Sequence, residues 1–96
     1  MATQIGTVTI DFGSTPTNTG TILVTGLTGL TLDTHKEAYV QADDTTVDNT
    51  AVEHRLLGIW CRFSCEYVSA TTMNIHCDLF IGEVIGTFKI HYVTAS

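Results

Sequence analysis

The sequence is poor in charge, and especially poor in basic residues. Four lysine and arginine residues stand against ten aspartate and glutamate residues, which gives a net charge of −6. An acidic surface repels phosphate backbones and anionic lipid headgroups, so we expect neither nucleic acid nor a membrane as a partner. No apolar run approaches the roughly 18 to 20 residues that span a bilayer, and the N-terminus lacks the basic and apolar regions of a signal peptide. These absences predict synthesis in the cytoplasm.

Proline and cysteine are also scarce. Proline occurs once, and the three cysteines are Cys61, Cys65 and Cys77. If residues 56–68 form a strand, Cys61 and Cys65 lie about 13 Å apart along it, which is too far for a disulfide. We therefore expect buried free thiols.

The residues that are present predict a small all-β domain. The chain has 96 residues, of which 44% are hydrophobic, so it forms one domain over residues 1–96 with one modest core. Threonine is the commonest residue, and apolar and polar residues alternate in short runs, which is typical of strands. This alternation predicts strands at 5–12, 20–26 and 35–42.

The stretch 43–55 interrupts the alternation and holds much of the acidity. Its segment Thr50-Ala51-Val52-Glu53 has the form of a capping box, so one helical turn is expected within a long loop. Asp48, Glu53 and His54 in this loop are candidate contact residues.

The last forty residues predict three antiparallel strands, at 56–68, 73–81 and 84–93, joined as a meander. Opposed residues in an antiparallel pair must share a face, which limits the possible loops. A loop at 69–71 and a turn at Gly82-Glu83 satisfy this condition. The predicted buried pairs are Cys65 with Ile75, Phe63 with Cys77, Cys61 with Leu79, Ile75 with Ile90, and Cys77 with Phe88. Ile59 and Ile81 are predicted to face inward as well.

The opposite face of the same meander is predicted to be mostly polar. It places Arg62 opposite Asp78 and Ser64 opposite His76, with His91 also pointing outward. The apolar face needs a second sheet, which the N-terminal half supplies. The predicted fold is therefore an antiparallel β-sandwich or a jelly-roll-like barrel with a C-terminal three-strand meander.

Metal binding and catalysis are not favoured by the spacing of the reactive residues. The four histidines and three cysteines form no C-x2-C or H-x3-H pair, and the acidic loop lacks the spacing of an EF-hand. Cys65 and Cys77 face the core, and no G-x-S-x-G motif is present. We therefore expect no enzyme activity, no cofactor and no metal.

An aromatic row remains on the polar face. The predicted register brings Trp60 opposite Phe80, and Phe80 opposite Ile85, on the face that also carries Arg62 and Asp78. An apolar stripe on a polar face is typical of a contact with another chain, where tryptophan is favoured. A loop of the same chain, at 13–19 or 43–55, is an equal alternative as the cover of this row.

Four segments of the sequence resemble small virion-associated proteins of tailed bacteriophages. They are VTIDFG at 8–13, HKEAYV at 35–40, DDTTVDNTAVEH at 43–54 and GTFKIHYV at 86–93. The chain departs from that pattern in its cysteine-rich central strands and at Tyr92-Val93, where a tryptophan is expected.

The resemblance implies a structural protein of the virion. Three roles are compatible with it: a capsid decoration (cement) protein, a head fibre component, or a tail fibre component. The first predicts a homotrimer that binds the major capsid protein or another virion protein and stabilises the shell. The alternative is a receptor or carbohydrate recognition module of a fibre, which would use Trp60, Tyr39 and the 43–55 loop.

Overall fold

The structure of the protein is a computed structural model that describes residues 3–95. These residues form six strands and one helix. In chain order the elements are β1 (Thr3–Asp11), β2 (Thr19–Val24), β3 (His35–Tyr39), α1 (Ala51–Trp60), β4 (Cys61–Ser69), β5 (Thr72–Leu79) and β6 (Thr87–Ala95). The strands predicted at 5–12, 20–26 and 35–42 are thus present, with ends shifted by up to three residues.

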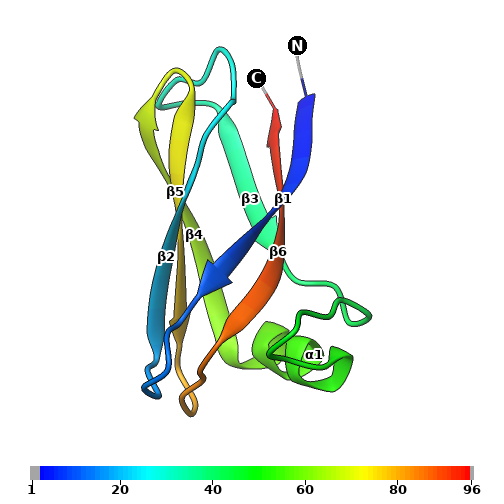
Figure 1. Cartoon of the computed structure of the whole chain (residues 1–96). Helices are drawn as coiled ribbons and strands as arrows, with labels where there is room; N and C mark the ends of the chain where they lie inside the picture. The colour runs from blue at the N-terminus through cyan, green and yellow to red at the C-terminus, as the bar shows by residue number, and fades with distance from the viewer. Residues whose placement is uncertain (1–2, 96) are drawn as a thin grey trace.

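The strands form two antiparallel sheets of three strands each. One has the order β1-β6-β3 and the other the order β2-β5-β4. Figure 1 shows the second sheet along one side of the molecule, while α1 lies at the end of the first sheet that is remote from both termini. The expectation of an antiparallel, β-rich chain is confirmed.

The predicted pairing of β4 with β5 is confirmed in register. Cys65 lies opposite Ile75, and Arg62 lies opposite Asp78. The other predicted pairs of these two strands are Phe63 with Cys77, Cys61 with Leu79, and Ser64 with His76, and all three are present. The register can be predicted because alternation on both strands leaves one set of loop lengths that keeps apolar residues on one face.

The connection of β4 to β5 achieves this register in a different way from the predicted loop. Ser69 already pairs with Thr72, and the register shifts between Tyr67 and Ser69. The bulge adds one residue to β4, so a tighter turn produces the same pairing as the loop predicted at 69–71.

The prediction of a C-terminal three-strand meander is wrong. β6 pairs with β1 and β3 in the other sheet, and the second neighbour of β5 is β2. Ile75 therefore lies opposite Ile22, and Ile90 lies opposite Val8. In place of a tight turn at Gly82-Glu83, the connection 80–86 carries the chain from one sheet to the other. The rule that opposed residues share a face could not reveal this pairing, because any strand with the same alternation of apolar and polar residues satisfies the rule.

The strand predicted at 56–68 is also wrong for residues 56–60. Residues 51–60 form α1, and the strand begins only at Cys61. The capping box at Thr50 and Glu53 is real, but it begins a helix of ten residues instead of a single turn. His54 and Leu57 are the buried residues of α1, one helical turn apart. Ile59, predicted to face inward, is 60% exposed.

One hydrophobic core cluster contains residues of both sheets and of α1. Ile10, Phe88 and Ile90 of the first sheet are buried, as are Ile75 and Cys77 of the second. Leu57 brings α1 into the same cluster. Of these positions, Phe88, Ile90, Ile75 and Cys77 were predicted to face inward from alternation alone. Ile81, also predicted to face inward, lies beyond β5 and is exposed.

Candidate functional site

The surface around α1 and the connection 80–86 contains most of the residues that the sequence suggested for contact. The two segments are joined at the end of the helix, where the Phe80 N–H donates a hydrogen bond of 3.0 Å to the Trp60 carbonyl oxygen. Trp60 and Phe80 are therefore neighbours as predicted, although Trp60 ends a helix and not a strand. Ile85 lies further along the same connection.

These three residues differ in exposure. Trp60 is half-buried and packs against the core, while Phe80 is 64% and Ile85 49% exposed. Ile81 in the same connection is also exposed. Large apolar side chains that stay in contact with water in one short segment are typical of an interaction surface.

A cleft of about 290 Å³ separates α1 from this connection. Leu56, Trp60, Val84, Ile85 and Phe88 form its apolar lining, and Asn49, Glu53 and Glu83 are its polar lining residues. This volume is at the lower limit of ligand pockets, which measure roughly 300–1,000 Å³. It suits one or two side chains of a partner better than a whole small molecule.

The side of the cleft formed by the connection is fixed by hydrogen bonds. Asn49 Nδ2 donates to the carbonyl oxygens of Ile85 and Thr87 at 3.1 and 2.8 Å. Val84 exchanges two backbone hydrogen bonds with Thr17, at 2.9 and 3.1 Å. A surface held in this way loses little conformational entropy when a partner binds.

Asp48 and Glu53, two of the predicted contact residues, have structural partners. Asp48 Oδ2 accepts hydrogen bonds from the backbone N–H and the hydroxyl group of Thr87, at 3.0 and 2.8 Å. Glu53 Oε1 accepts from the Thr50 N–H at 2.7 Å, which completes the helix cap. Both side chains are exposed, so these bonds leave them accessible to a partner.

His54 is fully buried, so its ring cannot make the surface contact that the sequence suggested. Its Nδ1 lies 2.9 Å from the Thr50 carbonyl oxygen, and its Nε2 lies 2.9 Å from the Lys89 backbone nitrogen. A carbonyl oxygen only accepts and an amide N–H only donates, so the fitting form is the neutral ring with its proton on Nδ1. His54 therefore connects α1 to β6.

Arg62 and Asp78 are opposite one another on exposed strand positions, yet no ion pair joins them in the described part of the chain. Asp78 instead accepts a hydrogen bond of 2.7 Å from the hydroxyl group of Thr19 on β2. The two opposite charges are thus paired in the register as predicted, but their side chains do not form an ion pair.

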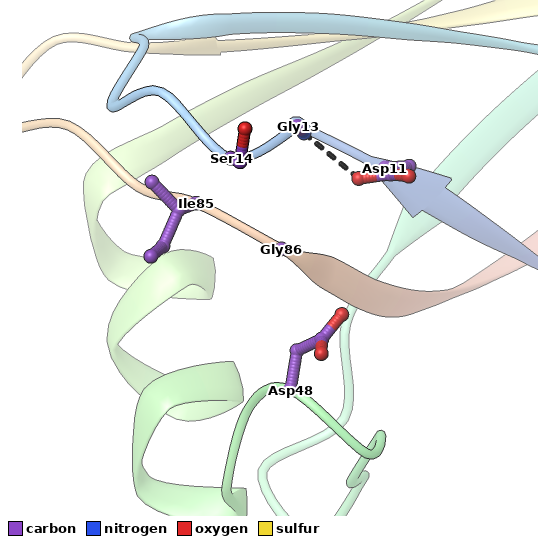
Figure 2. Close-up of a pocket in the computed structure, with 6 residues that line it drawn as sticks. All are labelled: Asp11, Gly13, Ser14, Asp48, Ile85 and Gly86. Atoms are coloured by element: carbon purple, nitrogen blue, oxygen red, sulfur yellow. Dashed lines mark hydrogen bonds between the residues drawn. The ribbon is translucent and has the colours of Figure 1, made fainter.

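A second depression, of about 410 Å³, lies where residues 11–14, the acidic loop and the connection 80–86 meet (Figure 2). Asp11, Gly13, Ser14, Asp48, Ile85 and Gly86 line it. Asp11 Oδ1 accepts a hydrogen bond of 2.8 Å from the Gly13 N–H, and Asp48 reaches from its loop toward β6. Each carboxylate is thus already used to hold a turn or a loop.

His91 and Asp44 form the most buried acid and base pair. The His91 Nε2 lies 2.7 Å from Asp44 Oδ2, and their side chains are 16% and 8% exposed. His91 was predicted to point outward, but the acidic loop covers it because Asp44 reaches back to β6. Asp44 also accepts a hydrogen bond from the Gln41 N–H, and Tyr39 stacks on the His91 ring at 5.4 Å. The pair therefore fastens the loop.

A row of polar bonds crosses the outer face of the β2-β5-β4 sheet. His76 on β5 lies 2.9 Å from the Thr21 hydroxyl group on β2 and 2.9 Å from Glu66 Oε1 on β4. The hydrogen bonds from His76 and Asn74 hold the pKa of the Glu66 carboxyl group below its ordinary value. The outward position of His76 and the polar character of this face are as predicted.

This lowered pKa predicts how Glu66 affects stability with pH. Its contribution is fully present above pH 4.5, the ordinary value, and is lost as the pH falls through the lowered pKa. The difference in urea midpoint between the wild type and Glu66→Gln should therefore shrink below pH 4.5. In a His76→Ala background the same comparison should show a weaker pH dependence. An unchanged pH dependence in that background would contradict the assignment to His76.

The three thiols are free, as expected, but only Cys77 is fully buried. A hydrogen bond with Cys77 lowers the pKa of the Cys61 thiol, and the same bond together with burial raises the pKa of Cys77. Burial also raises the pKa of Cys65. The thiolate is the reactive form, so reactivity should follow the order Cys61, Cys65, Cys77.

Iodoacetamide labelling followed by site-resolved mass spectrometry checks this order. In the folded protein at mildly alkaline pH, Cys61 should be alkylated first and Cys77 last. In urea the three sites should react at similar rates, because the differences arise from the fold. Modification of Cys77 in the folded protein as fast as Cys61 would contradict the prediction.

Within residues 3–95, no three histidine, cysteine, aspartate or glutamate side chains are grouped so that they could hold a metal ion. No helix in this part of the chain has both the length and the apolar character needed to cross a membrane. No protein family, curated protein or solved structure matches the chain.

Proposed function

We propose that the protein is a non-enzymatic structural protein of a phage virion, a capsid decoration (cement) protein that stabilises the shell through protein–protein contacts. The observation that carries this proposal is the set of exposed apolar side chains Phe80, Ile81 and Ile85 beside the cleft of Trp60. The motifs at 8–13, 35–40, 43–54 and 86–93 support the assignment to a virion.

We propose further that the two sheets are the layers of a β-sandwich or a jelly-roll-like barrel. Both sheets contribute to one hydrophobic cluster, since Ile10 and Phe88 lie in the first and Ile75 and Cys77 in the second. Two antiparallel sheets that bury one face each against the other define a sandwich. In this arrangement the end that carries α1 and the connection 80–86 is free to meet a partner.

The proposed partner is the major capsid protein or another virion protein, and the proposed assembly is a homotrimer. A contact with a shell subunit buries apolar side chains that are costly to leave in water. Each site on the shell that is occupied adds interface area between neighbouring subunits. The protein would therefore raise the resistance of the particle without taking part in a reaction.

Particles of the encoding phage, stripped of the protein and then reconstituted, test this proposal. Stripped particles should lose resistance to heat or osmotic shock, and the wild-type protein should restore it. A double variant, Phe80→Ser with Ile85→Ser, should restore less. Val68→Ser is the matched control, because Val68 is 48% exposed and lies next to the last residue of β4, the strand whose first residue directly follows α1. Equal resistance with and without the protein would exclude the cement role.

A recognition module of a tail fibre or head fibre is the second candidate. The observation that favours it is Tyr39, which is 44% exposed and stacks on His91 at an interplanar angle of 15°. A fixed, exposed aromatic ring is a suitable platform for the apolar face of a sugar. Binding on a glycan array that is lost in Tyr39→Ala would favour this candidate, whereas no binding to any glycan would exclude it.

A further inference from the structure

The cleft between α1 and the connection 80–86 combines an apolar lining with negative charge. Trp60, Leu56 and Val84 are among its apolar residues, and Glu53 and Glu83 are its charged residues. No lysine or arginine is among the described residues that line it. An apolar side chain could enter such a cleft, but an acidic neighbour on the same partner would be repelled.

The two carboxylates are placed differently. Glu53 is held at the helix terminus, where its Oε1 accepts a hydrogen bond of 2.7 Å from the Thr50 N–H. Glu83 lies in the connection beside Val84, and its side chain is exposed. A cation bound between them would meet one carboxylate fixed by the fold and one that can adjust to it. Charge complementarity of this kind selects partners and sets their orientation more than it adds affinity.

We propose that this cleft binds a segment of a partner protein in which an apolar side chain, such as leucine or phenylalanine, stands next to lysine or arginine. The apolar side chain would enter between Trp60 and Ile85, and the basic group would face Glu83. The fixed walls, held by the Asn49 and Thr17 hydrogen bonds, receive the segment without rearrangement. This inference rests on the proposed function, because it names the chemistry that the virion partner presents.

The single tryptophan of the chain lines the cleft, so its fluorescence reports on occupancy. The probe is a capped synthetic peptide, Gly-Ser-Lys-Leu-Leu-Lys-Ser-Gly, titrated into the full chain at low salt. Two control peptides replace either both lysines with glutamate or both leucines with serine. We expect saturable binding of the first peptide alone, with a shift of Trp60 emission to shorter wavelength.

Two exposed positions supply the variants. Glu83→Lys should weaken binding of the basic peptide about three- to fivefold, and Ile85→Ser should weaken it roughly tenfold. Val68→Ser should leave the affinity unchanged. Because these side chains are exposed, the variants should keep the urea midpoint of the wild type, which confirms that they fold.

Three results would overturn the inference. Equal binding of the lysine and glutamate peptides would show that charge has no part in recognition. A lack of binding by any peptide would show that the cleft does not take such segments. A concentration-dependent dimer in analytical ultracentrifugation that Ile85→Ser abolishes would show that a second copy of the chain covers the cleft.

These results are separable from failure of the proposed function. If reconstituted particles gain resistance from the protein but no peptide binds, the cement role stands and the cleft assignment fails. If the basic peptide binds and Glu83→Lys weakens it, but particles are equally resistant with and without the protein, the cleft assignment stands and the cement role fails.

Discussion

Replacement of Phe88 by alanine should lower the free energy of unfolding by about 3–5 kcal/mol. Phe88 is 1% exposed, and its ring meets Phe12 edge-on, with centroids 5.7 Å apart and an interplanar angle of 85°. The substitution removes this aromatic contact and leaves a cavity that the surrounding strands fill only in part. Since small domains have about 5–15 kcal/mol of stability in total, the loss should be a large fraction of it. Urea unfolding at equilibrium measures it.

Phe80→Ala is the matched control, because it removes the same atoms from a side chain that is 64% exposed. Its effect should stay within about 0.5 kcal/mol. The slope of the unfolding free energy against urea should be equal in the wild type and both variants, which shows that the change lies in stability. Losses of similar size at positions 80 and 88 would contradict the described core.

His54→Ala should cost about 3 kcal/mol in the free energy of unfolding. The ring is fully buried and packs against Phe88, with centroids 5.0 Å apart. Besides leaving a cavity, the substitution removes the acceptor of the Lys89 N–H, whose hydrogen bond to Nε2 is 2.9 Å long. A buried donor without a partner costs about 1–3 kcal/mol on its own.

Two further variants separate packing from hydrogen bonding. His54→Phe keeps a ring of similar size but accepts no hydrogen bond from Lys89, so it should still lose about 1–3 kcal/mol. His35→Ala is the control, since the side chain of His35 is 63% exposed, and it should change stability by less than about 0.5 kcal/mol. A loss below 1 kcal/mol for His54→Ala would contradict the role of His54 as the connection between α1 and β6.

The β4–β5 pairing shows what the sequence can predict. Cys65 and Ile75 were placed opposite each other because both strands alternate and only one set of registers buries all their apolar residues. Alternation also placed Phe88 and Ile90 in the core. The β4–β5 register depends on two strands that are neighbours in the sequence. The inward positions depend only on the alternation of side chains between the two faces of a strand.

The strands that pair with β6 could not be predicted in the same way. Val8 and Ile75 are both apolar, inward-facing residues, so either is an acceptable neighbour for Ile90. The choice is made by the connection 80–86, whose backbone passes through positive φ at Gly82 and Gly86. A side chain at Gly86 would also meet the Asp48 Cβ atom at 2.8 Å, so this glycine permits the close approach of the acidic loop. Gly82 fits both the predicted tight turn and this longer crossing, so the sequence did not distinguish them.

The candidate site was predicted in part. Trp60 and Phe80 were placed side by side, although through a strand that is in fact a helix. The capping box gave the start of α1, but the alternation that continues from Cys61 concealed its length, because Ile59 fits both patterns. The structural role of His54 could have been suspected from its spacing with Leu57, which places both on one face of a helix.

The central position of β6 has a consequence for how the chain folds. β6 is the strand that pairs with both β1 and β3, and it is the last of the six in the sequence. As the chain leaves the ribosome, β1 and β3 must wait for residues 87–95 before their sheet can form. Since pairings distant in sequence slow folding, we expect this sheet to assemble late, after β2, β4 and β5 have met. Until then, β1 and β3 are open to chaperones or to other nascent chains.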